Sequence, residues 1–148
     1  MPKSIKFDEK TLGFIRLFSS VTSVPVKDCI LLEEDGIIIF IVGSQDVGKA
    51  IGRKALNVKF LREKTQKDID IIGFANDPTE FLRNVFLPAK VEEIVFQDRE
   101  GQKVAFVRAG SDQKGIVIGR NGRNINKAKL LMRRHFDFDD VLINSSNS

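Results

Sequence analysis

Two glycines that bracket two polar residues, Gly119-Arg120-Asn121-Gly122, form the stretch of this sequence best suited to hold an anion. An apolar run precedes them, and a basic pattern with helical spacing follows from Arg123 to Arg134. Glycine lets a backbone turn sharply and approach a bulky ligand closely. A helix that starts at such a turn directs its free N–H groups and its positive dipole end into the loop. The stretch therefore predicts an anion-binding turn between two helices, and the alternative is a glycine turn with solvated arginines.

A second copy of this stretch lies 67 residues upstream, at Gly52-Arg53-Lys54-Ala55. Seven of fifteen positions are identical at that constant offset, with no gap. The matched residues are Gly43, Ser44, Gly48, Ile51, Gly52, Arg53 and Asn57 with Gly110, Ser111, Gly115, Ile118, Gly119, Arg120 and Asn124. Because the period is about half of the 148-residue chain, we expect a tandem of two small domains rather than a solenoid.

Positive charge is concentrated around the two copies. Residues 46–67 and 113–134 together hold fourteen Lys and Arg but two acidic residues, a net charge of +12. The whole chain carries only +4, so the remainder carries −8. A segregated positive surface is typical of proteins that bind a polyanion.

The elements that must position the first loop can be read from periodicity. Asp8 is placed to cap a helix over 8–21, with Phe7 and Leu12 as a hydrophobic staple. Leu12, Ile15, Phe18 and Val21 recur at helical spacing and should face a core. The remaining elements are strands 26–32 and 37–42 joined by an Asp-Gly turn, a short helix 47–51, a helix 56–66 and a strand 69–74. The continuous apolar run in 37–42 predicts a central strand.

The second half repeats this order after a boundary at Asn76-Asp77-Pro78. Asp77, Pro78 and Glu80 have the spacing of a cap, a first-turn proline and a third-position acid, which predicts a helix to about Phe86. Strands 91–96 and 104–108, a short helix from about 112, a long helix to about 135 and a strand 139–143 follow. Residues 144–148 are polar and are expected to fray.

This order around two glycine loops is similar to the type II KH fold, an α/β (α+β) arrangement. Two such units and little else resemble the archaeal NusA-like transcription factors, with a first KH domain over 1–75 and a second over 76–148. The resemblance implies a three-stranded mixed sheet in each domain, covered by helices on one face. The two strands that flank the helix pair are expected to be parallel, because a helical crossover joins them.

The resemblance also implies single-stranded RNA as the ligand, clamped by each loop. In that family picture bases lie beside the loop, between its helices and the last strand. The implied RNA-binding residues are Lys49, Gly52, Arg53, Lys54, Ala55, Asn57, Lys59, Lys114, Gly119, Arg120, Asn121, Gly122, Arg123, Asn124 and Lys127. One departure is Ala55, which stands where the motif has its second glycine. If that position needs a positive φ, alanine costs about 1 kcal/mol or more.

The function implied by this resemblance is a non-enzymatic RNA-binding factor acting on nascent transcripts during elongation, termination or antitermination, with RNA polymerase as partner. Two alternatives remain: a KH factor of ribosome biogenesis or RNA decay, and an RNA-binding subunit of an enzyme on another chain. We expect no cofactor, no metal and no membrane contact, and a monomeric protein in the cytoplasm. The N-terminus has no apolar segment long enough for a signal peptide.

Several other groups could suggest chemistry but are better explained structurally. Gly43 to Ala50 is one residue short of a P-loop, and its alanine removes the hydroxyl that would bind Mg²⁺. The only histidine, His135, suits a helix C-terminus. The acidic residues near the C-terminus and in the second half are expected at a solvated turn (Asp137, Asp139, Asp140) and at an exposed strand edge (Glu92, Glu93). The single cysteine, Cys29, is expected to be a buried thiol.

Overall fold

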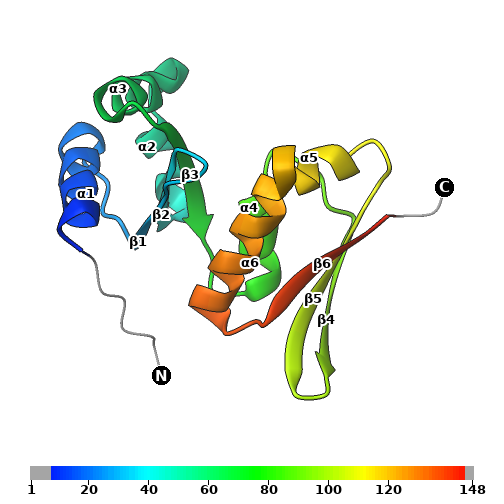
Figure 1. Ribbon diagram of the computed structural model, residues 1–148. Helices are drawn as coiled ribbons and strands as arrows, with labels where there is room; N and C mark the ends of the chain where they lie inside the picture. The colour runs from blue at the N-terminus through cyan, green and yellow to red at the C-terminus, as the bar shows by residue number, and fades with distance from the viewer. Residues whose placement is uncertain (1–7, 146–148) are drawn as a thin grey trace. The chain divides into compact units, whose positions relative to one another are not determined.

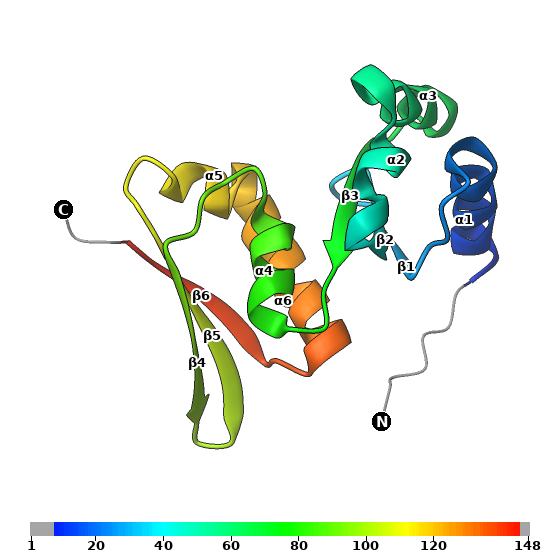
Figure 2. The ribbon, with the colours of Figure 1, turned by 180° about the vertical axis from the view of Figure 1, so that it is seen from behind.

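The computed structural model describes residues 8–145. The chain divides into two compact units, the first ending at Ala75 and the second beginning at Asn76. Each unit is a small sheet with helices against it (Figure 1, Figure 2). The staple expected of Phe7 and the last tail residues, 146–148, lie outside the described residues. Within residues 8–145, no helix is long and apolar enough to cross a bilayer.

The first unit has the predicted order of elements. They are α1 (Glu9–Thr22), β1 (Asp28–Leu32), β2 (Ile37–Gly43), α2 (Val47–Ile51), α3 (Leu56–Thr65) and β3 (Asp68–Phe74). Single turns of 3₁₀ helix precede α2 at Ser44–Asp46 and α3 at Arg53–Ala55. Asp8 caps α1 as expected, since its carboxylate accepts the Thr11 N–H at 2.7 Å. β1 starts two residues later than the sequence suggests.

β2 is the central strand of the first sheet, as its apolar run predicts. The strand order is β1-β2-β3, with β1 antiparallel and β3 parallel to β2. The parallel pair confirms the crossover through α2 and α3. Gly36 takes a φ of 62° in the turn between β1 and β2, where the sequence places an Asp-Gly turn.

The core of the first unit lies between the helices and β1 and β2. The ring of Phe18 from α1 stacks on Phe40 from β2 with centroids 4.2 Å apart, and both side chains are buried. Ile38, Leu61 and Cys29 join this cluster, so the prediction of a buried thiol is confirmed. One of the periodic positions in the first helix is not in the core. Leu12 is exposed, whereas Phe14 and Leu17 pack against the cluster.

The second unit repeats the order. It consists of α4 (Pro78–Phe86), β4 (Glu93–Arg99), β5 (Gln102–Ala109), α5 (Lys114–Ile118), α6 (Arg123–Phe136) and β6 (Asp140–Ser145). Its sheet has the order β4-β5-β6, again antiparallel and then parallel. A third single turn of 3₁₀ helix, Arg120–Gly122, joins α5 to α6.

Three expectations for the second unit were inaccurate. Its hairpin is longer than the apolar runs indicate, because β4 and β5 continue through polar residues to a tight turn at Glu100 and Gly101, both with positive φ. Asp77 occupies the N-cap position of α4, but its side chain makes no capping hydrogen bond. The first two residues of the expected frayed tail, Asn144 and Ser145, belong to β6, since they pair with Arg108 and Ala109.

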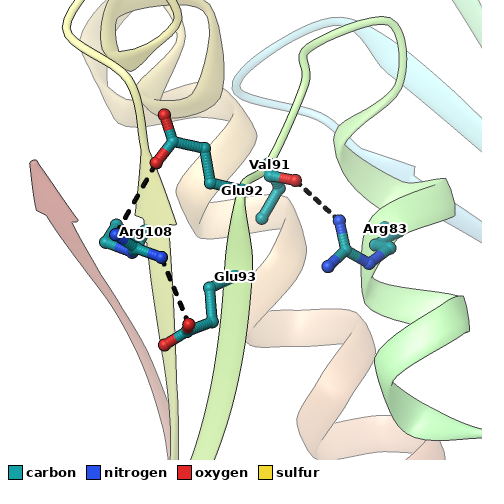
Figure 3. A network of polar contacts seen from close by, with 5 residues as sticks. All are labelled: Arg83, Val91, Glu92, Glu93 and Arg108. Carbon is teal, nitrogen blue, oxygen red and sulfur yellow. Dashed lines mark hydrogen bonds and ion pairs between the residues drawn. The ribbon is translucent and has the colours of Figure 1, made fainter. Parts of the chain in front are cut away.

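Two arginines, one from α4 and one from β5, contact the residues around the start of β4 (Figure 3). Arg83 of α4 donates from Nη1 to the Val91 carbonyl at 2.6 Å. Arg108 of β5 lies between two carboxylates, 3.1 Å from Glu93 and 3.8 Å from Glu92. Glu93 begins the edge strand as expected, whereas Glu92 precedes it. The two acids therefore neutralise an arginine and help to set the hairpin register.

The acidic residues after α6 are also used within the fold. Asp139 accepts the Lys103 N–H at 2.7 Å, and Asp140 lies 3.2 Å from the Lys129 ammonium. Asp137 ends α6 in the left-handed conformation. Among the described residues no group of three or more His, Cys, Asp or Glu is arranged to hold a metal ion.

Candidate nucleic-acid interface

The two glycine loops have nearly the same backbone conformation. The leading glycines, Gly52 and Gly119, have φ and ψ of 82° and 166° and of 79° and 166°. Two residues later, Lys54 and Asn121 are both left-handed, with φ of 53° and 57°. The repeat found in the sequence is therefore a repeat of loop geometry.

The leading glycine of each loop is required by space as well as by angle. A Cβ atom at Gly52 would lie 2.8 Å from Nδ2 of Asn57, and one at Gly119 would lie 2.8 Å from the backbone nitrogen of Asn124. Real Cβ contacts are not that short. A side chain at Gly119 would have to displace the backbone of the following helix, and one at Gly52 would have to displace the Asn57 amide. A positive φ near 80° would add strain for an L-residue.

The last loop position is left-handed in both copies. Gly122 has a φ of 74° and Ala55 a φ of 59°. The motif's second glycine position therefore needs a positive φ, and in the first loop Ala55 adopts it. The first loop carries a backbone strain that Gly122 avoids in the second loop.

An asparagine side chain crosses each loop. Nδ2 of Asn57 donates to the Lys49 carbonyl at 3.2 Å, and Nδ2 of Asn124 donates to the Ile116 carbonyl at 2.6 Å. Each bond joins the first turn of the helix after the loop to the helix before it. Asn57 and Asn124 therefore hold the loop in shape, which is a role that the sequence repeat did not reveal.

The helices after the loops begin without a side-chain cap, and the first N–H of each, at Leu56 and Arg123, donates to a backbone carbonyl of the preceding 3₁₀ turn. Neither α3, with ten residues, nor α6, with fourteen, has a side-chain cap on its first N–H groups. Uncapped amides at a helix start favour an anion, because the N–H donors and the helix dipole act together.

Most of the expected cationic residues surround these openings and are exposed. The six exposed ones are Lys49, Arg53, Lys54, Lys59, Lys114 and Arg120. Within residues 8–145 none of these six takes part in an ion pair. Since nothing in the fold neutralises them, they present their charge to solvent.

Two of the expected cationic residues are placed differently. Lys127 is only 6% exposed and Arg123 is half-buried. Both have interactions inside the protein. Ordinary helical spacing could not distinguish them from the exposed lysines.

The near-match to a P-loop forms an ordinary strand-to-helix turn. Ser44 donates its hydroxyl to the Phe74 carbonyl at 2.7 Å and so ties the turn to β3. Ala50 is buried in the core.

His135 packs edge-on against the Phe81 ring with centroids 5.5 Å apart.

The sequence pattern missed one surface feature beside the first loop. Leu56 and Phe60, two large apolar residues of α3, are 59% and 43% exposed. The only signal in the sequence is that the second copy has Arg123 and Lys127 at the matching positions.

Comparison with known proteins gives one family. The model of the NusA-like second KH domain matches residues 78–144. The chain is 35% identical over 121 residues to the probable transcription termination protein NusA of Methanocaldococcus jannaschii, covering 82% of this chain and 65% of that relative. It is 32% identical over 124 residues to the protein of the same name from Methanococcus vannielii, covering 84% and 70%.

A solved structure agrees with the fold. The crystal structure of APE1850 superposes with a TM-score of 0.82 at 33% identity, over 93% of this chain and all of that one. The expected fold class is confirmed: two tandem type II KH domains, each with a three-stranded mixed sheet covered by helices on one face.

Proposed function

Because this chain belongs to the archaeal NusA-like family, we propose that it is a non-enzymatic factor that binds single-stranded RNA through its two glycine loops. The observation that carries the proposal is the repeated loop itself. Each copy presents a helix start without a side-chain cap, beside exposed cations that have no acidic partner in the described chain. Such a site suits a phosphate backbone.

The proposed contact surface combines backbone amides with polar and cationic side chains. Backbone amides at the starts of α3 and α6 receive phosphate oxygens, while Lys49, Arg53, Lys54 and Lys59 in the first unit, and Lys114, Arg120 and Asn121 in the second, surround the strand. A KH loop clamps about four nucleotides, so two loops give a footprint of about eight or more. Lys127 is left out of the direct contacts because its side chain is buried.

The names of the relatives indicate the process. Both are named probable transcription termination protein NusA, and the chain spans 65% of the length of the first. We take the RNA ligand to be the nascent transcript and RNA polymerase to be the protein partner. Co-purification with polymerase tests this part, and co-purification with pre-ribosomal RNA instead would contradict it.

The experiment that tests RNA binding compares two probes of equal length, an unstructured RNA and a hairpin stem. An extended strand can enter a glycine loop, whereas a duplex keeps its backbone wound and its bases paired. We expect clear preference for the unstructured RNA in a titration with the full chain. Equal affinity for the two probes would contradict the proposal. Both RNAs are expected to stay intact with divalent metal present, and cleavage would contradict a non-enzymatic role.

A further inference from the structure

Two large apolar side chains are exposed on α3, directly after the first loop. Leu56 is the first residue of the helix and Phe60 follows one turn later, so both lie on the same face. With Val21 from α1 they line a pocket of about 550 Å³. Asn57, Lys59 and Glu63 complete the lining. Exposed apolar side chains gathered around one hollow are typical of a binding surface.

Positive charge surrounds this hollow. Lys59 lies in its wall, and the ammonium of Lys64 lies 5.5 Å from the centre of the Phe60 ring. The exposed cations Arg53 and Lys54 belong to the adjoining loop. Glu63 is the one acid among the lining residues. A ligand that complements this surface carries both negative charge and a flat apolar part, and a nucleotide has both.

We propose that this hollow binds an unstacked base of the RNA strand whose phosphates lie in the first loop, with the Phe60 ring as stacking surface. The inference rests on the proposed function. Aromatic side chains beside a positively charged track are how proteins hold single strands without reading sequence. Leu56 and Val21 would supply apolar contact at the edges of the base, and Lys59 and Lys64 would offer positive charge to its phosphates.

The hollow is distinct from the groove in which the KH resemblance places bases. That groove lies between the loop helices and the last strand, whereas no residue of β3 lines this hollow, which belongs to α1 and α3. The base held here is therefore an additional one, outside the nucleotides clamped by the loop.

The second unit has basic residues at the equivalent positions. At the offset of 67 residues, Leu56 corresponds to Arg123 and Phe60 to Lys127. Neither residue offers an apolar or aromatic surface. The first loop, which has Ala55 in place of its second glycine, would thus gain a contact that the second loop does not have.

The test uses the full chain and an unstructured RNA of about ten nucleotides or more, long enough for both loops. Phe60→Ala is expected to lower the affinity about fivefold or more, since base–aromatic stacking contributes that much. Leu12→Ala is the matched control, because Leu12 is similarly exposed, at 38%, on the same unit but outside the hollow. Its affinity should not change.

A second RNA with the same backbone but without bases separates stacking from charge. Phe60→Ala should bind this abasic RNA as tightly as the unchanged protein does. Phe60→Lys, which introduces the residue of the second unit, should also lose the base-dependent part. A fluorescent adenine analogue placed along the RNA gives an independent readout, because the protein has no Trp or Tyr. One position should change its emission with the unchanged protein and not with Phe60→Ala.

Four outcomes would overturn the inference. If the unchanged protein binds no RNA, the proposed function fails with it. If the unchanged protein binds RNA and both Phe60 variants bind it equally well, only this inference fails. Equal losses on normal and abasic RNA would mean that no base is stacked. Unchanged RNA affinity together with lost binding to purified RNA polymerase would assign the hollow to a protein partner.

Discussion

The two loops differ in the residue that adopts a positive φ at their last position. Lys54 and Asn121 are left-handed alike, but the next position holds Ala55 in one loop and Gly122 in the other. A left-handed L-residue is strained because its Cβ crowds the neighbouring carbonyl, whereas glycine has no such atom. The two loops thus present the same shape at different conformational cost.

Exchanging these two residues tests that cost. Ala55→Gly should stabilise the chain by about 0.5–1 kcal/mol, the relief of strain less the entropy that glycine adds to the unfolded state. Gly122→Ala should destabilise it by about 1 kcal/mol. Its Cβ would meet no atom closer than 3.6 Å, so strain alone is measured. Thermal melts of both variants measure these changes in stability. The prediction requires that the melting temperature rises for Ala55→Gly and falls for Gly122→Ala.

Charge at the loop tips can be reversed without disturbing the core. Placing Asp at Arg120 and Asn121, or at Arg53 and Lys54, puts negative charge where uncapped amides attract phosphate. All four side chains are exposed, so stability should change by no more than about 0.5 kcal/mol per site. RNA titration should show that each pair weakens binding.

The pair in the second loop is expected to cost more RNA affinity, because Gly119 and Gly122 give that loop greater backbone freedom. Thermal melts serve as the control for folding. A larger loss from Arg53 and Lys54 would mean that the extra charge of Lys54, or the neighbouring hollow on α3, outweighs the second glycine. Our ranking of the two loops would then be wrong.

Among the helices, α1 has a side-chain cap and the two helices after the loops have none. The Thr11 N–H donates to the Asp8 carboxylate, and this hydrogen bond holds the pKa of Asp8 below its ordinary value of 3.8. Neither α3 nor α6 has a side chain that accepts from its first N–H groups. α4 also lacks a side-chain cap, so the absence of a cap does not by itself distinguish the helices that follow the loops.

The cap of α1 predicts a pH dependence. Because the folded pKa of Asp8 is lowered, its stabilisation is present above the unfolded pKa and disappears as pH falls through the folded value. Asp8→Ala should therefore lower the melting temperature at neutral pH, and the difference should shrink below about pH 4. Asp8→Asn keeps an uncharged acceptor and serves as control. A difference that persists undiminished at pH 2 would contradict this role.

Positive and negative charges are segregated along the chain. The two loop windows carry +12 and the remainder −8, so the small net charge of +4 conceals a strong local field. The acids outside the windows are in part matched by arginines, as at Arg108 (Figure 3). The exposed loop cations are not so matched and stay available to phosphate.

This division predicts a steep salt dependence of RNA binding. If about five cations contact phosphates, the logarithm of the binding constant should fall with that of the salt concentration at a slope of about −3.5, taking about −0.7 for each contact. Titrations at several salt concentrations measure the slope. The Asp pair at Arg120 and Asn121 should make it shallower, whereas Phe60→Ala should leave it unchanged. A slope near zero would show that the loops are not the RNA surface.

Much of this protein is encoded in local patterns. Glycine spacing, apolar periodicity and the Asp8 cap act within a few residues, so the order of elements, the central position of β2 and the two loops all follow from the sequence alone. The ends of the elements do not follow from the sequence alone. At β4 and β5, hydrogen bonds between the two strands extend the hairpin through polar residues that show no strand pattern.

Burial, by contrast, depends on what lies opposite a side chain. Phe60 and Lys127 occupy equivalent positions of equivalent helices, yet the aromatic ring is 43% exposed and the lysine 6%. Helical spacing assigns both to one face but does not say what covers that face. The same limit applies to Asn57 and Asn124, whose partners lie eight residues away across a turn. Only the folded chain brings each amide to its carbonyl, because the left-handed loop residues must first reverse the chain direction.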